Sequence, residues 1–477
     1  MMFKSLLNPL QLGKKRLCMF LLVMMMAALA ACSGAEKESP AAQNPPAATE
    51  NGNVSSETAA EPEEPEKVEE PEAEPEAVEL TVYDPTSATS ADEFMKKYGD
   101  AISAKFPHVT LHFVHSPDTN PGGHITSIIT AGEPIDIFLN ADLNHYRLIT
   151  PFKLEHDMSE IIKKKNFDLS VIDAGVMESV KSLSSDGESI YALPYSMNVL
   201  GLMYNIDLFD RFGQDYPTDG MTWDETYEIA RAMTREEDGV QYRGFITQFY
   251  NMAWLNQLSV PFVDPETDKT LLNSDERWSK YVNNLVRFFE IPGNELKERT
   301  FGAIRNLFNA SQTAAMYAYF YPTTEIEGLN WDIVTLPEFP ELPGVGSQPM
   351  LQLAYVTSYS KHKEAAFDIV AYMASDEFQT ERIAKPGIGF PISSNEQVKN
   401  AFAQDAPFLE GKNIHALILK SSPAVSPNES PYGSTAASLF EWTMYDLAQG
   451  IVDVNTALRV TAEEADQEIA ALKAGNE

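Results

Sequence analysis

Three tyrosines recur at every second position of one short segment and could form a platform for a sugar. They are Tyr317, Tyr319 and Tyr321. On a β-strand, side chains two residues apart point to the same face, so all three would lie together. Aromatic rings stack on the apolar C–H face of a pyranose and offer a large contact area at low entropic cost. Packing of the rings inside a sheet core is the alternative.

Two further segments carry side chains that could contact a solute. Asn140 and Asp142 directly follow the apolar run Ile135–Leu139, and their polar groups could accept hydrogen bonds from hydroxyls. Trp254 lies in a helix-like stretch, where it either packs in a core or forms an aromatic platform. Trp223 follows a helix cap, and we expect it to pack in the core.

Catalytic and metal-binding patterns are weak. The sequence has two cysteines, Cys18 and Cys32, both near its N-terminus, so the body has no thiol chemistry. Four histidines fall between His108 and His124, but His112 and His115 would point to opposite faces of a strand. We therefore expect no metal site and no cofactor. Nucleophile-elbow, His-Glu-x-x-His and phosphate-loop motifs are not found, which disfavours an enzyme.

The N-terminus has the pattern of an export signal. Three basic residues, 14–16, precede an apolar run from Leu17 to Ala31, which is shorter than the roughly 20 residues that span a bilayer. Leu29-Ala30-Ala31-Cys32 resembles the bacterial lipobox. Residues 1–31 are thus predicted to be a signal peptide, and Cys32 to be lipidated on the extracytoplasmic face of the cell membrane.

Residues 32–78 are predicted to be a disordered tether behind the lipidated cysteine. Pro, Glu, Ala, Ser and Asn dominate from Ser33 to Val78, so the segment lacks the apolar surface that would offset ordering entropy. The formal net charge of −35 argues against nucleic acid and against direct adhesion to anionic lipid. The acyl chain would therefore supply the membrane contact.

The rest of the chain alternates short strands with helices. Runs at 80–83, 109–114 and 135–139 are strand-like, and helices are expected from Ser90 to about Phe106 and over 125–131. Thr222-Trp223-Asp224-Glu225 fits a second capping box after the one at Ser90. Amphipathic helices are expected over 361–374 and from Asn455 onwards. This order predicts an α/β fold, with ligands at the carboxyl ends of the strands.

One long segment carries a family resemblance. Residues 190–209, Ile-Tyr-Ala-Leu-Pro-Tyr-Ser-Met-Asn-Val-Leu-Gly-Leu-Met-Tyr-Asn-Ile-Asp-Leu-Phe, resemble the crossing strand and the Tyr-Asn strand of extracellular solute-binding proteins of the maltose-binding type. Residues 221–225, 313–316 and 331–337 resemble that family's helix opening, Ala-Ala-Met strand and following strand, in the same order. The resemblance covers residues 79–477. After the tyrosine strand the family has Gly-Pro-Trp, whereas this chain has Phe320-Tyr321-Pro322.

The resemblance implies a two-lobed, periplasmic-binding-protein-like fold of type II with a ligand cleft between lobes that close over the solute. The first lobe would be 79–196 plus about 353–398, and the second about 197–352 plus 399–477. It also implies a monomeric receptor of an ABC importer that docks on the permease's transmembrane subunits. The residues that we expect to contact ligand are Tyr83, Asn140, Asp142, Tyr195, Asn198, Trp254, Tyr317, Tyr319 and Tyr321.

The favoured cargo is a sugar or an oligosaccharide, from the aromatic residues and from the habit of the family. Peptides, polyamines and other organic solutes are alternatives. A strongly basic ligand would require carboxylates that converge in the cleft, and the sequence does not place them. A sensor partner with the same fold is a further alternative, distinguished by the lack of ligand-induced closure. A lipoprotein glycosidase is the enzymatic alternative.

Overall fold

The computed structural model describes residues 76–475 apart from 87–88, 118–119, 420–422 and 425–427. The predicted signal peptide, Cys32 and nearly all of the predicted tether lie outside the described residues. Contacts divide the chain into Met1–Glu72 and Ala73–Glu477, and every described residue belongs to the second unit. Among these residues, no helix is both long and apolar enough to cross a membrane.

The first of two five-stranded sheets has the order β2-β1-β3-β10-β4. β1 runs parallel to both β2 and β3, while β10 is antiparallel to β3 and β4. The strands are β1 (Val78–Asp84), β2 (Val109–His115), β3 (Ile137–Ala141), β4 (Ala192–Asn198) and β10 (Met350–Val356). We call this sheet with its helices the first lobe.

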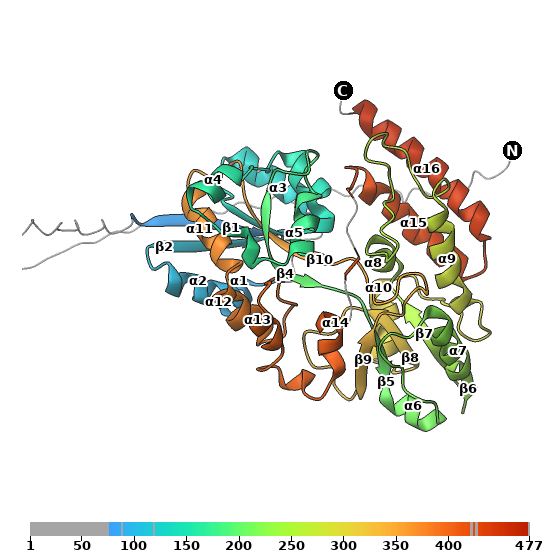
Figure 1. Ribbon diagram of the computed structural model, residues 1–477. Coiled ribbons are helices and arrows are strands. Elements are labelled where there is room, and N and C mark those ends of the chain that lie inside the picture. The colour runs from blue at the N-terminus through green and yellow to red at the C-terminus, as the bar shows by residue number, and fades with distance from the viewer. Residues whose placement is uncertain (1–75, 87–88, 118–119, 420–422, 425–427, 476–477) are drawn as a thin grey trace, which may run out of the picture. The chain divides into compact units, whose positions relative to one another are not determined.

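The helices of the first lobe come from two separate parts of the chain (Figure 1). They are α1 (Ala91–Phe94), α2 (Asp100–Lys105), α3 (Pro121–Ala131), α4 (Ser159–Lys164), α5 (Ala174–Lys181), α11 (Lys363–Met373), α12 (Asp376–Phe378) and α13 (Glu396–Asn400). The predicted helix from Ser90 is confirmed: Ser90 and Glu93 form a reciprocal capping box, and a π-helical turn at Met95–Gly99 joins α1 to α2.

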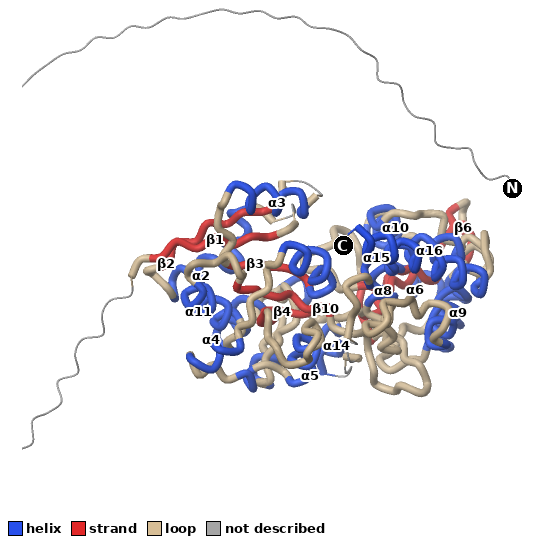
Figure 2. The backbone as a smooth tube through the Cα atoms, turned by 90° about the horizontal axis from the view of Figure 1, so that it is seen from above, coloured by secondary structure: helices blue, strands red, loops and turns tan. Residues whose placement is uncertain are grey.

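The second lobe is built around the other sheet, which has the order β6-β7-β8-β5-β9. Its strands are β5 (Gly201–Asn205), β6 (Arg235–Glu237), β7 (Val240–Thr247), β8 (Ala314–Tyr319) and β9 (Trp331–Thr335). Its helices are α6 (Ile206–Phe212), α7 (Trp223–Met233), α8 (Phe249–Trp254), α9 (Glu276–Phe289), α10 (Phe301–Asn309), α14 (Ala416–Leu419), α15 (Gly433–Ala448) and α16 (Val454–Gly475). In the view from above, α9, α10, α15 and α16 lie around the sheet of this lobe, and β6 lies at its outer edge (Figure 2).

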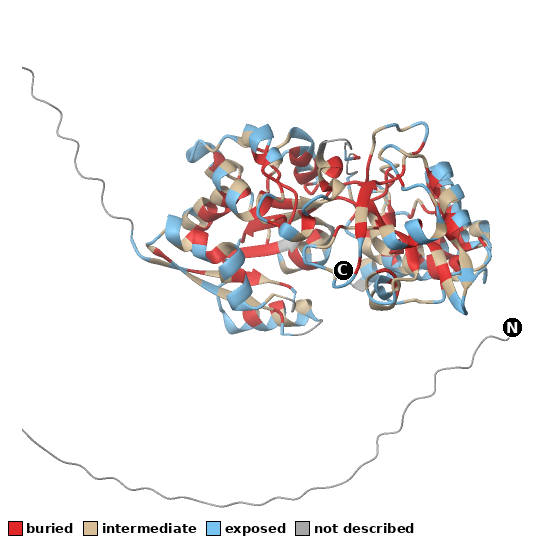
Figure 3. Cartoon of the chain, turned by 90° about the horizontal axis from the view of Figure 1, so that it is seen from below, coloured by how far each residue is buried: buried red, intermediate tan, exposed pale blue. Residues whose placement is uncertain are grey.

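Each sheet has its own apolar core, and Figure 3 shows the buried residues gathered inside each lobe. The amphipathic patterns predicted these cores well. In α11, Ala366, Ile369, Val370 and Met373 are all buried, as the helical spacing required. In the last helix the apolar residues Leu458, Ala462, Ala465 and Ile469 are buried, whereas Leu472 is exposed.

The chain crosses between the lobes at several points. Val199 and Leu200 separate β4 from β5, and Gln348 and Pro349 precede β10. The backbone N–H of Leu200 donates to Ser347 Oγ at 2.9 Å, which ties these two crossings together. A third crossing follows α12, since Phe390 packs in the second core while Ile392 packs in the first.

Candidate functional site

A pocket lies where the two lobes meet the second crossing segment. The pocket leaves about 30 Å³ free between its walls, within a wider space of about 530 Å³ that includes open solvent. The first lobe contributes Asp142 and Tyr146, which follow β3, and residues at the end of α5. The second lobe contributes Trp254 and the start of α15. The complete lining is Asp142, Tyr146, Ser179, Ser182, Leu183, Trp254, Leu255, Gln348, Pro349, Glu429, Ser430 and Ser434.

Trp254 provides the aromatic wall of the pocket. It is the last residue of α8, whose Phe249, Met252 and Ala253 are buried in the second core. Its ring stacks on Tyr250 with centroids 6.0 Å apart and on Phe262 with centroids 5.7 Å apart. Trp254 is half-buried, so part of the indole remains available to a solute. The residue therefore packs against the core and also lines the pocket, which combines the two interpretations of the sequence.

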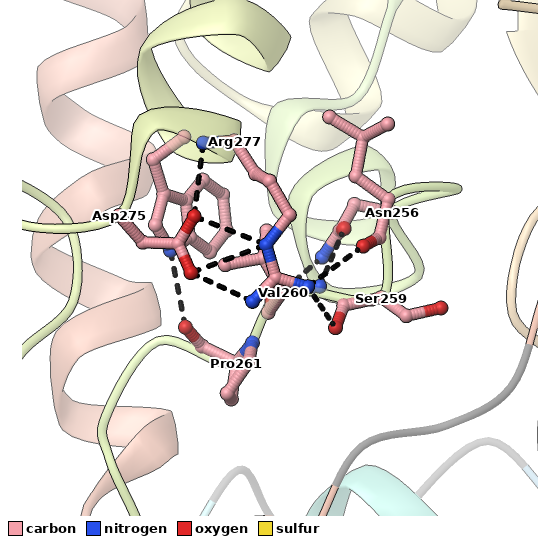
Figure 4. A network of polar contacts seen from close by, with 8 residues as sticks. Asn256, Ser259, Val260, Pro261, Asp275 and Arg277 are labelled. Atoms are coloured by element: carbon pink, nitrogen blue, oxygen red, sulfur yellow. Dashed lines mark hydrogen bonds and ion pairs between the residues drawn. The ribbon is translucent and has the colours of Figure 1, made fainter. Parts of the chain in front are cut away.

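A polar network holds the loop that follows Trp254 (Figure 4). The buried amide of Asn256 donates to the carbonyls of Ala253 and Val260 and accepts from the Val260 N–H at 3.1 Å. Arg277 pairs with Asp275 and donates to two carbonyls of the same loop. Because these polar groups are satisfied by one another, the loop and the adjoining indole have a fixed position.

The loop is also connected to the crossing segment. The Gln348 N–H donates to the carbonyl of Leu255 at 3.0 Å, and its side-chain amide donates to the carbonyl of Asn256 at 2.9 Å. Gln348 lies beside Pro349, just before β10 enters the first lobe. Trp254 thus lies next to a segment that joins the two lobes.

Two carboxyl groups from different lobes face the pocket. Asp142 Oδ2 accepts the backbone N–H of Leu351 at 3.1 Å. Glu429 precedes α15, and its Oε2 atom is buried without a hydrogen-bond partner among the described residues. Burial, and secondarily the negative charge of Asp142, raise the pKa of Glu429 to about 8.

Tyrosine hydroxyls complete the polar surroundings of the pocket. Tyr146 donates its hydroxyl to the carbonyl of Leu183 at 3.2 Å. Burial, followed by the charge of Glu429, raises the pKa of Tyr146 to about 12. Burial also raises the pKa of Tyr250 to about 12, although the nearby Arg147 acts in the opposite direction. Both hydroxyls therefore stay neutral at ordinary pH and can serve as hydrogen-bond donors or acceptors.

Of the nine residues that the sequence proposed for ligand contact, Asp142 and Trp254 line this pocket. Asn140 pairs through its backbone with Leu353, and its side chain lies outside what the structure describes. Asn198 is half-buried at the end of β4, opposite Met350, and does not line the pocket.

The tyrosines of the first lobe lie in its core. Tyr83 is fully buried, packs on Phe138 and lies 3.2 Å from His124 Nδ1 through its hydroxyl. Tyr195 is buried beside Tyr98, with ring centroids 5.8 Å apart. Neither residue lines the pocket described above.

The tyrosine platform differs from its prediction. Tyr317 and Tyr319 do share a face, with parallel rings 5.3 Å apart, but β8 ends at Tyr319. Tyr321 lies beyond the strand, where it packs on Phe390 and donates its hydroxyl to the carbonyl of Gly387 at 3.1 Å. The pairing of β8 with β5 stops at Gly201, so period-two alternation no longer applies at Tyr321.

Sequence reasoning missed Tyr146 and Glu429. Tyr146 lies in the polar run after a predicted strand, so extending the strand-end argument by four residues would have included it. Glu429 lies in the stretch Asn428-Glu429-Ser430-Pro431, whose composition indicates only a loop.

The two α/β lobes, their multiple crossings and the pocket at their junction define a two-lobed solute-binding protein. A model of the bacterial extracellular solute-binding protein family matches residues 86–380, more than half of the chain. The chain belongs to this family, which confirms the resemblance found in the sequence and the predicted fold class.

Solved structures share this fold. An ABC substrate-binding protein from Listeria monocytogenes, in complex with cycloalternan, superposes with a TM-score of 0.65 at 18% identity, over 83% of this chain and 100% of that one. The sugar-binding protein MalE from Xanthomonas citri gives 0.63 at 14% identity, over 83% and 98%. A sugar transporter from Rhizobium etli in an open conformation gives 0.62 at 20% identity, over 82% and 99%.

Proposed function

We propose that this protein is the solute receptor of an ABC importer, that it binds a sugar or an oligosaccharide between its lobes, and that it delivers this cargo to the permease subunits. The observation that carries the proposal is the junctional pocket, where the half-buried indole of Trp254 faces polar groups of both lobes. A pyranose has an apolar C–H face and polar hydroxyls. The aromatic ring can stack on the first, and the carboxyl, amide and hydroxyl groups can form hydrogen bonds with the second. Sugar-binding structural neighbours support the same class of ligand.

We propose the lobe boundaries that the sequence predicts. The first lobe would be 79–196 plus about 353–398, and the second about 197–352 plus 399–477. The protein is proposed to act as a monomer that binds its solute without transforming it. Membership of a solute-binding family supports that role over the glycosidase alternative.

Titration with carbohydrates tests the proposal. A sugar that binds only the folded protein stabilises it by about 2.7 kcal/mol at 100 times its Kd, so the melting temperature should rise in a thermal-shift screen of mono- and oligosaccharides. Trp254→Ala should weaken binding roughly tenfold or more, because it removes the aromatic contact.

Tyr319→Ala is the matched comparison, since Tyr319 is a half-buried aromatic residue of the same lobe that does not line the pocket. Its affinity should stay close to that of the unaltered protein. If Tyr319→Ala lost affinity and Trp254→Ala did not, the binding site would lie at the predicted tyrosine platform and not at this pocket. A screen in which every carbohydrate leaves the melting temperature unchanged would refute the sugar proposal.

We also propose that Cys32 is lipidated and anchors the mature chain at the extracytoplasmic face of the membrane. The lipobox-like sequence before Cys32 supports this. The tether would end at residue 77 and not at the expected Val78, because Val78 already pairs with Val109 in β1. In cell fractionation, Cys32→Ser should leave the membrane fraction, because the acyl chain is the proposed hold on the bilayer. The unaltered protein should remain with the membrane, and equal retention of both would contradict the anchor.

A further inference from the structure

The carboxyl group of Glu429 is the least satisfied polar group of the pocket. The residue as a whole is half-buried, yet its Oε2 atom is enclosed and has no hydrogen-bond partner among the described residues. A Cβ placed on Gly433 would lie 2.9 Å from this oxygen and 3.6 Å from the Trp254 ring. The carboxyl is therefore held between the start of α15 and the indole. Burying a carboxylate without a partner is costly, so this position requires compensation from elsewhere.

Protein charges do not supply that compensation. Within the described part of the chain, Asp142 is the one charged group whose field acts on Glu429, and its charge has the same sign. The positive charge of Arg147 lowers the pKa of Tyr250, whereas the charges of Glu429 and Glu441 raise it. Arg147 forms no ion pair with Glu429 in the described structure. Tyr146 faces Glu429 from the first lobe with a neutral hydroxyl that is already donated to Leu183. The residues that line the pocket thus include two carboxyl groups and no Lys or Arg side chain.

We propose that the pocket selects a ligand that carries a protonated amine, which binds between Glu429 and Asp142 while the remainder of the ligand packs on Trp254. This inference rests on the proposed function and specifies its cargo as a cationic sugar. An ammonium group has three N–H donors and a positive charge, so it can donate to Glu429 and Asp142 at the same time. It also gains from the adjacent aromatic face. A neutral hydroxyl brings no positive charge to offset the charge of a second carboxylate, so it does not favour ionisation of Glu429.

Glu429 can respond to such a ligand because burial raises its pKa to about 8. At pH 7 the empty pocket therefore holds this carboxyl mostly protonated. Binding of an ammonium group favours the carboxylate, so the complex should release a proton to the buffer. A neutral sugar would leave the carboxyl protonated.

Calorimetry on the full-length protein at pH 7 tests the proposal with four probes. They are the disaccharide of glucosamine, its N-acetylated form, the corresponding glucose disaccharide, and spermidine. The glucosamine disaccharide should bind at least tenfold more tightly than its acetylated and glucose counterparts. Its binding heat should change between two buffers of different ionisation enthalpy in proportion to the released proton.

Variants then locate the amine. Glu429→Gln keeps the shape of the side chain and should abolish both the preference for the amine and the proton release. Gly433→Ala keeps the carboxyl of Glu429, but its added Cβ forces that carboxyl to move, so binding of the amine should weaken. Alanine has a higher helix propensity than glycine, so α15 should remain folded in this variant. Glu468→Gln removes the same charge from an exposed site on α16, and it should leave binding unchanged.

The outcomes separate this inference from the proposed function. Equal or tighter binding of the acetylated or glucose disaccharide would overturn the amine and leave the sugar receptor intact. Spermidine binding that depends on Glu429, without binding of any sugar, would support the amine and refute the sugar. If neither the glucosamine disaccharide nor spermidine binds, or if Glu429→Gln binds the amine as tightly, the inference is wrong.

Discussion

Glu429 links the chemistry of the pocket to the stability of the fold. The pKa of this carboxyl is raised to about 8, first by burial and then by the like charge of Asp142. Because the folded state holds the proton more tightly than the unfolded chain, whose carboxyl has a pKa near 4.5, folding is favoured when the group is protonated. This contribution is fully present below about pH 4.5 and is lost as the pH rises to about 8.

The Glu429→Gln variant should therefore show a pH-dependent gain in stability. Glutamine cannot ionise, so the variant avoids the cost of a buried carboxylate. Relative to the unaltered protein, its free energy of unfolding should be nearly unchanged at pH 4.5 and higher by on the order of 1–3 kcal/mol above pH 8. Denaturant unfolding at several pH values measures the difference. The exposed Glu468→Gln serves as the control, and a difference that is independent of pH would contradict the assigned ionisation.

At the scale of single residues, the sequence could propose types of side chain but not their surroundings. Asp142 lines the pocket and follows the carboxyl end of β3, a topological position that the sequence reveals, while its contact with a ligand stays a prediction. For the other candidates, the sequence did not show which side chains would be buried in a core. Tyr83 and Tyr195 carry the same aromatic chemistry as Trp254 but lie in the core of the first lobe. The role of Glu429 depends on its distance from Asp142 and from Trp254, which are far away in the chain.

At the scale of elements, local signals were sufficient where local contacts determine the structure. The capping box of Thr222 and Glu225 at the start of α7 is present, as is the one at Ser90. The strand predictions for β1, β2 and β3 also match. The end of β8 was mispredicted because its pairing partner β5 sets where the ladder stops, and that partner lies more than a hundred residues away. The tyrosine alternation continues in the sequence past the last paired residue.

Contacts between elements connect the pocket to the segments that join the two lobes. α8 ends at Trp254, and the loop behind it is bonded to Gln348 in the crossing segment before β10. Ser347 of the same segment accepts from Leu200 in the crossing between β4 and β5. A solute that pulls on the indole and on Asp142 would therefore act on two crossings at once. This arrangement favours a hinge in the crossing segments over a deformation within either core, because packed cores resist continuous change.

At the scale of the whole molecule, the proposed function requires the lobes to close around the ligand. A ligand shifts an equilibrium between open and closed states only if it binds one of them more tightly. A pocket lined by both lobes would fulfil this condition, because a solute that touches both lobes would lose contacts when they separate. A sensor partner of fixed geometry would bind without such a change.

Fluorescence transfer between dyes on the two lobes measures closure directly. The body has no cysteine, so Glu160→Cys in α4 and Glu468→Cys in α16 can be labelled in a Cys32→Ser background. The tightest-binding carbohydrate of the titration should change the transfer efficiency of this pair with the same midpoint as its binding heat. A pair within the first lobe, Asp100→Cys with Glu160→Cys, should give a constant efficiency. Measurable binding heat with constant transfer between the lobes would instead favour the rigid sensor partner, since the ligand would then have no preference for a closed state.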